Sequence, residues 1–418
     1  MNRSRLRYGL LGMGTLAYTV LMVVWFSVAA YLAEIVAELG LTSTQAGLLT
    51  GAIPLTYVPV ALFSGVVTDR IGPYRAIGIG LVLFGAAQVG RAGADSFAVL
   101  LGLTVVVGVG GTTITFGLPK LVAELFPTDA SGTPSSIYML GSFAGTASAF
   151  SIGRGVVGPM LGGWRPLFTA IGVAVLAYAV LWWVMVYLAP ISTLRGPADG
   201  AADTPDSVDT DESASTDGGV RGVATLRRDV GRVFRTPAMR WLVVVGVVYL
   251  LVVHGLQNWL ATVLRARGVA PTLAATVTSA FVVAEAVGTL TVPAVSDRLG
   301  RRGGVIAACG AGCALGTAAL LVPGVPFALP VAGALVVGVG VGGISPLVRM
   351  VPPELEGVGP ALTGTAVGLV FAVGELGGFL GPFLVGALFD LTGSYAPGLA
   401  VVGLACLGAV VAGRRIPA

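Results

Sequence analysis

The sequence contains very little charge. Asp, Glu, Lys and Arg together make up 11% of the 418 residues, about half the proportion typical of soluble domains. Hydrophobic residues make up 55%, and the mean hydropathy is +0.92. So few charges cannot cover the surface of such an apolar chain, which excludes a soluble enzyme, a nucleic-acid binder and a disordered regulator. We therefore expect a polytopic membrane protein.

Histidine and cysteine are also scarce. His254 is the only histidine, and the three cysteines, Cys309, Cys313 and Cys406, all lie in apolar runs. A disulfide framework is therefore not expected, and the ligands for a metal site are missing. No pairing of a nucleophile with a base stands out either. The sequence thus predicts no enzyme, no cofactor and no metal.

Apolar runs long enough to cross a bilayer recur along the whole chain. Because a spanning helix needs about 20 mostly apolar residues, the sequence predicts an all-α membrane protein with twelve transmembrane helices. They are arranged as six, a polar linker and six, so we expect an N-terminal half at 1–189, a linker at 190–238 and a C-terminal half at 239–418. The predicted spans are 9–31, 45–67, 74–92, 97–120, 134–157, 166–188, 239–262, 272–294, 303–322, 326–348, 361–384 and 395–413.

The distribution of basic residues predicts the orientation. If the N-terminus is cytoplasmic, nineteen of the 24 basic residues lie in cytoplasmic segments, and Arg349 is one of them. Four fall outside (Arg91, Arg165, Arg265 and Arg267), and Arg154 is left inside a span. Cytoplasmic loops carry an excess of Lys and Arg. We therefore expect a multi-pass protein of the plasma membrane with both termini and the linker in the cytoplasm.

The linker divides into two parts. Residues 199–217 are acidic and too polar to build a core. Residues 221–240 are basic and place apolar residues at roughly helical spacing, which is typical of an amphipathic helix on the inner membrane surface. A solvated linker with incidental periodicity is the alternative.

The two halves repeat three landmarks at nearly the same separation. Asp69-Arg70 followed by Gly72 recurs as Asp297-Arg298 followed by Gly300. Val107-Gly-Val-Gly recurs at Val337, and Gly158-Pro159 recurs as Gly381-Pro382. Such recurrence predicts two homologous six-helix halves, a pattern typical of transporters.

The repeated acidic and basic loop resembles the signature loop of the major facilitator superfamily, and the twelve predicted helices match that family as well. The resemblance implies the family's two-half fold and a cytoplasmic gate, in which Asp69 would meet the N-terminus of a helix from the opposite half. Topology-setting charges without a gating role are the alternative. The residues of this gating motif are Gly65, Asp69, Arg70, Gly72, Asp297, Arg298, Gly300, Arg301 and Arg302.

A second motif resembles the glycine-rich antiporter motif of helix 5 in the same family. Small residues allow helices to approach closely, so a packing role is implied. Arg154 stands where the other half keeps Gly377. The residues of this helix-packing motif are Gly145, Gly158, Pro159, Gly162, Gly368, Gly377, Gly381 and Pro382.

Charged and polar residues inside the predicted spans are costly to bury and are therefore candidate functional groups. Carboxylates near the middle of a span can hold or release a proton as their exposure changes. The alternatives are structural hydrogen bonds for the two glutamates and the histidine, and snorkelling toward the surface for Arg154. Thr112, Thr113, Thr115 and Tyr57 are expected to pack. The candidates for substrate binding or coupling are Arg154, His254, Gln257, Asn258, Glu285 and Glu375.

The sequence around Glu375 resembles that of the nitrate/nitrite and cyanate porters, although Glu375 stands where the nitrate group has asparagine. We therefore expect a secondary transporter of a small anion, a carboxylate or an inorganic oxyanion, driven by protons through alternating access. An Arg154 facing the cavity would pair with the cargo or with Glu285. The expected partners are the bilayer, the solute and protons, with no nucleic acid, and the chain is expected to act as a monomer. A proton-coupled multidrug efflux pump and a non-transporting membrane sensor are the alternatives.

Overall fold

A computed structural model describes residues 3–127, 132–188 and 228–416. Within these ranges every regular element is a helix and no strand occurs, which confirms the all-α prediction. Nine helices in the described ranges are long and apolar enough to cross a membrane. The chain is thus a multi-pass membrane protein, and the count of twelve spans stays a prediction.

The helices of the first half follow one another with short connections. Several begin at an N-cap or a proline, as expected where backbone N–H groups lack partners within the helix. Thr42, for instance, accepts from the backbone N–H of Gln45 in a capping box. The elements are α1 (Arg3–Ala30), α2 (Leu32–Leu39), α3 (Ser43–Ile71), α4 (Pro73–Ala92), α5 (Phe97–Leu125), α6 (Gly132–Ser148), the π-helix η2 (Ala149–Val157), α7 (Gly158–Leu161) and α8 (Trp164–Leu188).

The helices of the second half also follow one another with short connections, and within its described residues there is no counterpart of the short α2 or of the π-helix η2. Its elements are α10 (Pro237–Ala266), α11 (Pro271–Leu299), α12 (Arg302–Leu321), α13 (Ala328–Met350), the 3₁₀ turn η4 (Pro352–Glu354), α14 (Gly359–Thr392) and α15 (Ala396–Arg415).

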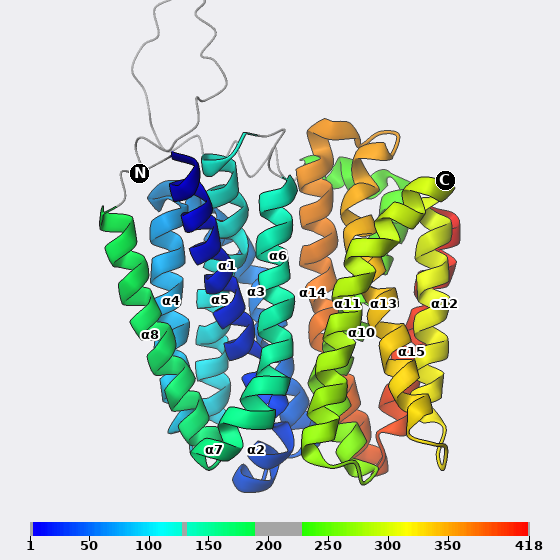
Figure 1. The fold of residues 1–418 in the computed structure, drawn as a ribbon. Coiled ribbons are helices and arrows are strands. Elements are labelled where there is room, and N and C mark those ends of the chain that lie inside the picture. The colour runs from blue at the N-terminus through cyan, green and yellow to red at the C-terminus, as the bar shows by residue number, and fades with distance from the viewer. Residues whose placement is uncertain (1–2, 128–131, 189–227, 417–418) are drawn as a thin grey trace, which may run out of the picture.

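The two halves stand side by side with their long helices roughly parallel (Figure 1). Both ends of the chain lie at one end of the bundle, which we call the termini end, and α2 and α7 lie at the other, which we call the α2 end (Figure 1). Contacts between the halves run mainly along α3 and α14, and between α11 and the continuous α6–η2 segment. The space between the halves is therefore bordered by helices from both.

Glycines of the predicted packing motif allow three close helix contacts. A Cβ atom at Gly377 or Gly381 would collide with the backbone of α10 at Val247 or Leu251. A Cβ at Gly145 would collide with the backbone of α1 at Thr19. These positions need glycine because the helix backbones touch.

Two members of the predicted packing motif have no packing role. Gly368 has no atom within 4 Å of the place that a Cβ would occupy, so it faces open space. Gly162 is also open, and its φ of +91° ends α7 in a left-handed turn, a conformation that favours glycine. The packing prediction is therefore wrong for Gly368 and Gly162.

This contrast gives a test of the packing on α14. We expect Gly377→Val to lower the free energy of unfolding by about 1–3 kcal/mol or more, because the added methyl groups push α14 away from α10. Gly368→Val makes the same substitution on the same helix in open space and should change it far less. Thermal unfolding of the two variants in detergent measures the difference. Equal midpoints would contradict close packing at Gly377.

The structure corrects the assignment of one basic residue to a loop. α13 extends to Met350, beyond the predicted end at 348, so Arg349 belongs to its last helical turn. Arg91 lies in the last turn of α4 and is fully buried within the protein, where its Nη1 donates to the carbonyl of Val24 at 3.2 Å. Of the linker, residues 189–227 lie outside the described residues. Residues 228–235 are helical, with Val233 buried.

Candidate functional site

A cavity of about 180 Å³ lies between the two halves. Its wall is built by α1, α3, α5 and α6 from the first half and by α10, α11, α13 and α14 from the second. Aromatic rings form much of the wall, among them Trp25, Tyr57, Phe143, Tyr249 and Phe371. The cavity therefore offers mainly apolar surface with a few polar groups, as small-molecule sites do.

Four of the six predicted binding or coupling residues line this cavity: His254 and Gln257 from α10, Glu285 from α11 and Glu375 from α14. Glu285 is buried and its Oε2 accepts from Gln257 Nε2 at 2.7 Å. The sequence separates these residues widely, and the packing of α10 against α11 and α14 brings them together.

Glu375 and His254 lie close to each other at Gly378. A Cβ at Gly378 would be 3.0 Å from Glu375 Oε2 and 3.0 Å from His254 Cδ2. Glu375 Oε2 and His254 Nδ1 are buried without a hydrogen-bond partner in the described part of the chain. The imidazole also stacks on Trp25 of α1, with ring centroids 5.7 Å apart. This pair of polar groups therefore lies where the second half meets the first.

The other two predicted residues do not line the cavity. Asn258 is buried, and its Nδ2 donates to the carbonyl of His254 within α10 at 2.7 Å. Arg154 lies at the α2 end, where its Nη2 donates to Glu34 Oε1 at 2.6 Å. The expected pairing of Arg154 with Glu285 is therefore wrong, since its partner is a carboxylate of α2.

Arg349 is a cavity residue that the sequence analysis assigned to a cytoplasmic segment. Its Nη1 donates to the carbonyl and to the hydroxyl of Ser345, both at 2.8 Å. Its guanidinium stacks on Phe371 with the central carbon 4.3 Å from the ring centroid. Among the described residues that line the cavity it is the only arginine or lysine. No carboxylate within the described ranges forms an ion pair with it.

Two residues that were expected only to pack also belong to the wall. Tyr57 of α3 and Thr115 of α5 line the cavity, and their hydroxyls are 2.9 Å apart. A tyrosine and a threonine inside apolar runs carry no sequence signal that separates a cavity wall from ordinary packing. The signal for Arg349 was present, because the apolar run of its helix continues past it to Met350.

The second copy of the predicted gating motif forms a local network. Arg302 binds Asp297 at 2.9 Å and Glu354 at 2.6 Å, all within the second half. Gly72 and Gly300 follow α3 and α11 at φ +83° and +60°, so both loops use glycine to end a helix. Gly65 lies within α3, but its surroundings and the side chain of Asp69 are outside what the structure describes. A contact of Asp69 with the opposite half stays a prediction. Arg70, Arg298 and Arg301 are exposed.

Comparison with known proteins gives matches over nearly the whole chain. A family model described as Major Facilitator Superfamily matches residues 14–382 and, in a second match, 258–417. The 3-(3-hydroxy-phenyl)propionate transporter of Escherichia coli (strain K12) is 30% identical over 379 residues, covering 87% of this chain and 84% of its own. The uncharacterized transporter YycB of Bacillus subtilis (strain 168) is 25% identical over 380 residues, covering 88% and 83%.

A solved structure gives a match of the fold. The bacterial homolog of the human lysosomal transporter Spinster, in its inward-facing and unoccupied conformation, superposes with a TM-score of 0.77 and 18% identity. The superposition covers 98% of each chain. The described helices therefore share the fold of that protein.

Proposed function

Because the chain belongs to the Major Facilitator Superfamily of membrane transporters, we propose that it carries a small organic anion through the central cavity by alternating access, coupled to protons. The bilayer surrounds it and its substrate is a small molecule. In this proposal it works as a monomer in the plasma membrane. Its termini are cytoplasmic, so that the α2 end faces outward.

The position of Arg349 in the cavity wall is the observation that supports an anionic substrate. A guanidinium is a planar fork of donors that matches a carboxylate, and in the described part of the chain only its Nη1 makes a hydrogen bond. Stacking on Phe371 fixes its plane. A cation held in the wall without a counter-ion favours an anionic ligand, since burial in a partly apolar site strengthens their attraction.

The aromatic wall favours an anion with an apolar body over an inorganic oxyanion. Trp25, Tyr57, Phe143 and Phe371 line the same cavity as the guanidinium, and aromatic rings pair well with one another. The relative named for 3-(3-hydroxy-phenyl)propionate carries such a molecule. The substrate class we propose is a small aromatic or aliphatic carboxylate.

The charges in the wall explain why a proton should accompany the anion. Glu285 and Glu375 lie in the same wall as Arg349, so an anion entering beside two ionised carboxylates would leave an excess of negative charge. Excess charge inside a membrane protein is costly. Protonation of one carboxylate offsets that charge, which couples the proton to the substrate.

Multidrug efflux remains the second candidate, because two carboxylates and an aromatic wall also suit a lipophilic cation. Arg349 opposes this candidate, since it would repel such a cargo. A non-transporting sensor would bind a ligand without moving it.

Ligand-induced thermal stabilisation tests the anion proposal. We expect 3-phenylpropionate to raise the unfolding midpoint of the purified protein, whereas its uncharged amide and tetraphenylphosphonium should leave it unchanged. The amide matches the size and ring of the carboxylate and lacks only its charge. Stabilisation by tetraphenylphosphonium, or equal stabilisation by the amide, would contradict the proposal.

A further inference from the structure

One carboxylate joins the two halves at the α2 end. Glu34 Oε1 accepts from Arg154 Nη2 at 2.6 Å and from Arg265 Nη1 at 2.8 Å. Arg154 belongs to η2 in the first half, and Arg265 lies in the last turn of α10 in the second half. Glu34 therefore connects the two halves, because it accepts a charged hydrogen bond from an arginine of each.

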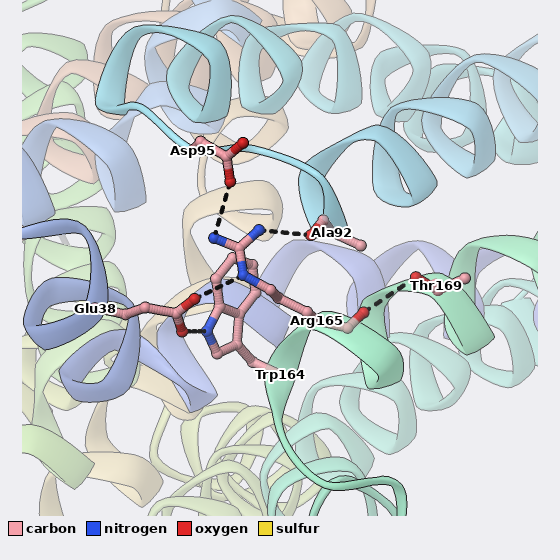
Figure 2. Close-up of polar contacts among 6 residues, drawn as sticks. All are labelled: Glu38, Ala92, Asp95, Trp164, Arg165 and Thr169. Carbon is pink, nitrogen blue, oxygen red and sulfur yellow. Dashed lines mark hydrogen bonds and ion pairs between the residues drawn. The ribbon is translucent and has the colours of Figure 1, made fainter.

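The short helix α2 is tied to the first half one turn further on. Glu38 accepts from Trp164 Nε1 at 2.5 Å and from Arg165 Nε at 2.6 Å (Figure 2). Arg165 also donates to the carbonyl of Ala92 at 2.8 Å and pairs with Asp95 at 3.4 Å (Figure 2). The donors Arg165 and Trp164 lower the pKa of the Glu38 carboxyl, which keeps this clamp charged.

The clamp fixes the direction in which Glu34 points. Glu34 and Glu38 are four residues apart and therefore share one face of α2. Since Glu38 binds Trp164 and Arg165 at the start of α8, and Arg165 in turn binds the last residue of α4, α2 moves with the first half. Glu34 is thus presented by the first half to Arg265 of the second.

Arg154 supports Glu34 from within the same half. Its guanidinium stacks on the ring of Tyr31, with the central carbon 4.6 Å from the ring centroid. The hydroxyl of Tyr31 occupies the space that a Cβ of Gly158 would need. The π-helix η2, a local widening that often accompanies function, carries Arg154 at this point. Arg154 is therefore a positioning residue for Glu34.

The α2 end is also where the halves pack most closely. A Cβ at Gly47 of α3 would lie 2.6 Å from the carbonyl of Pro382 of α14. Asp390 of α14 accepts from the backbone N–H groups of Ser43 and Thr44 at 2.9 and 2.7 Å. These N–H groups begin α3, where a carboxylate is favoured by the helix dipole. Toward the termini end, Gly364 of α14 has no atom within 4 Å of its Cβ position.

We propose that Glu34, Arg154 and Arg265 form a charged latch that holds the α2 end of the transporter closed. The pair between Glu34 and Arg265 breaks each time the cavity opens toward that end, while Glu34 and Arg154 stay together. The latch is independent of the cargo, because none of its three residues lines the central cavity. It goes beyond the proposed function and concerns the conformational step alone.

The test measures the separation of the halves and does not depend on transport. Spin labels are placed at Ala98 in the first turn of α5 and at Ala266 at the end of α10, both exposed, after Cys309, Cys313 and Cys406 are replaced by alanine. Electron–electron double resonance then gives the distance distribution in liposomes. We expect Glu34→Gln to raise the ratio of long to short distances about fivefold, as loss of a partly exposed ion pair allows. Arg265→Gln should give the same shift.

Asp95→Asn is the control, since it removes one carboxylate charge at the same end of the molecule, where Asp95 pairs with Arg165 within the first half. Its distance distribution should stay that of the unsubstituted protein. Unchanged distributions in both Glu34→Gln and Arg265→Gln would overturn the latch. An equal shift in Asp95→Asn would overturn it too, because the effect would then follow from loss of any negative charge at this end. A transport-inactive protein would still give either result.

Discussion

Arg349→Gln is expected to weaken the binding of a carboxylate substrate by about 10- to 100-fold, the loss that a charged hydrogen bond typically causes. Arg349 is the only arginine or lysine in the wall of the cavity as far as the chain is described. Arg349→Lys keeps the charge and loses the planar fork, so its loss should be smaller. Isothermal titration with the carboxylate that stabilises the protein most measures the Kd of each variant.

Arg414→Gln serves as the control for removal of one positive charge, because Arg414 is exposed at the end of α15 and far from the cavity wall. Its Kd should equal that of the unsubstituted protein. An Arg349→Gln protein with an unchanged Kd for the carboxylate would show that the anion is not bound by this residue.

Separate replacement of Glu285 and Glu375 by glutamine is expected to abolish proton-driven accumulation in at least one variant. Glutamine keeps the shape of the side chain but cannot exchange a proton. With a gradient of one pH unit, the unsubstituted protein can concentrate an anion up to about tenfold if one proton moves with it. The affected variant should only equilibrate the substrate while still exchanging labelled for unlabelled substrate.

Glu354→Gln is the matched control, because Glu354 pairs with Arg302 outside the cavity. It should accumulate substrate normally. If the Glu285 and Glu375 variants both concentrate substrate like the control, neither carboxylate couples the proton.

Much of the fold was predictable because the membrane imposes strong local rules. The length of an apolar run and the glycines that end helices at Gly72 and Gly300 can be read directly from the sequence. Glu285, Glu375 and His254 were found for a similar reason, since a polar group inside an apolar helix stands out wherever its partners lie. Such groups face a cavity because lipid offers them no hydrogen bonds.

The features that the sequence could not give depend on contacts between distant segments. Arg154 pairs with Glu34, a residue of a short helix outside the predicted spans, and no local pattern connects them. Arg349 is a different case. The apolar run of its helix continues past it to Met350, so the sequence holds the signal, but a helix end placed two residues too early assigns Arg349 to a loop. The π-helix at Ala149–Val157 was read as ordinary helix, because a wider turn has no clear sequence signature.

Uptake of a radiolabelled carboxylate into proteoliposomes, with and without an inward proton gradient, tests the central claim most directly. The account predicts that the carboxylate accumulates above its external concentration only while the gradient lasts, and that an ionophore which collapses the gradient releases the excess. Uptake no greater than in protein-free liposomes, or uptake unaffected by the gradient, would contradict it.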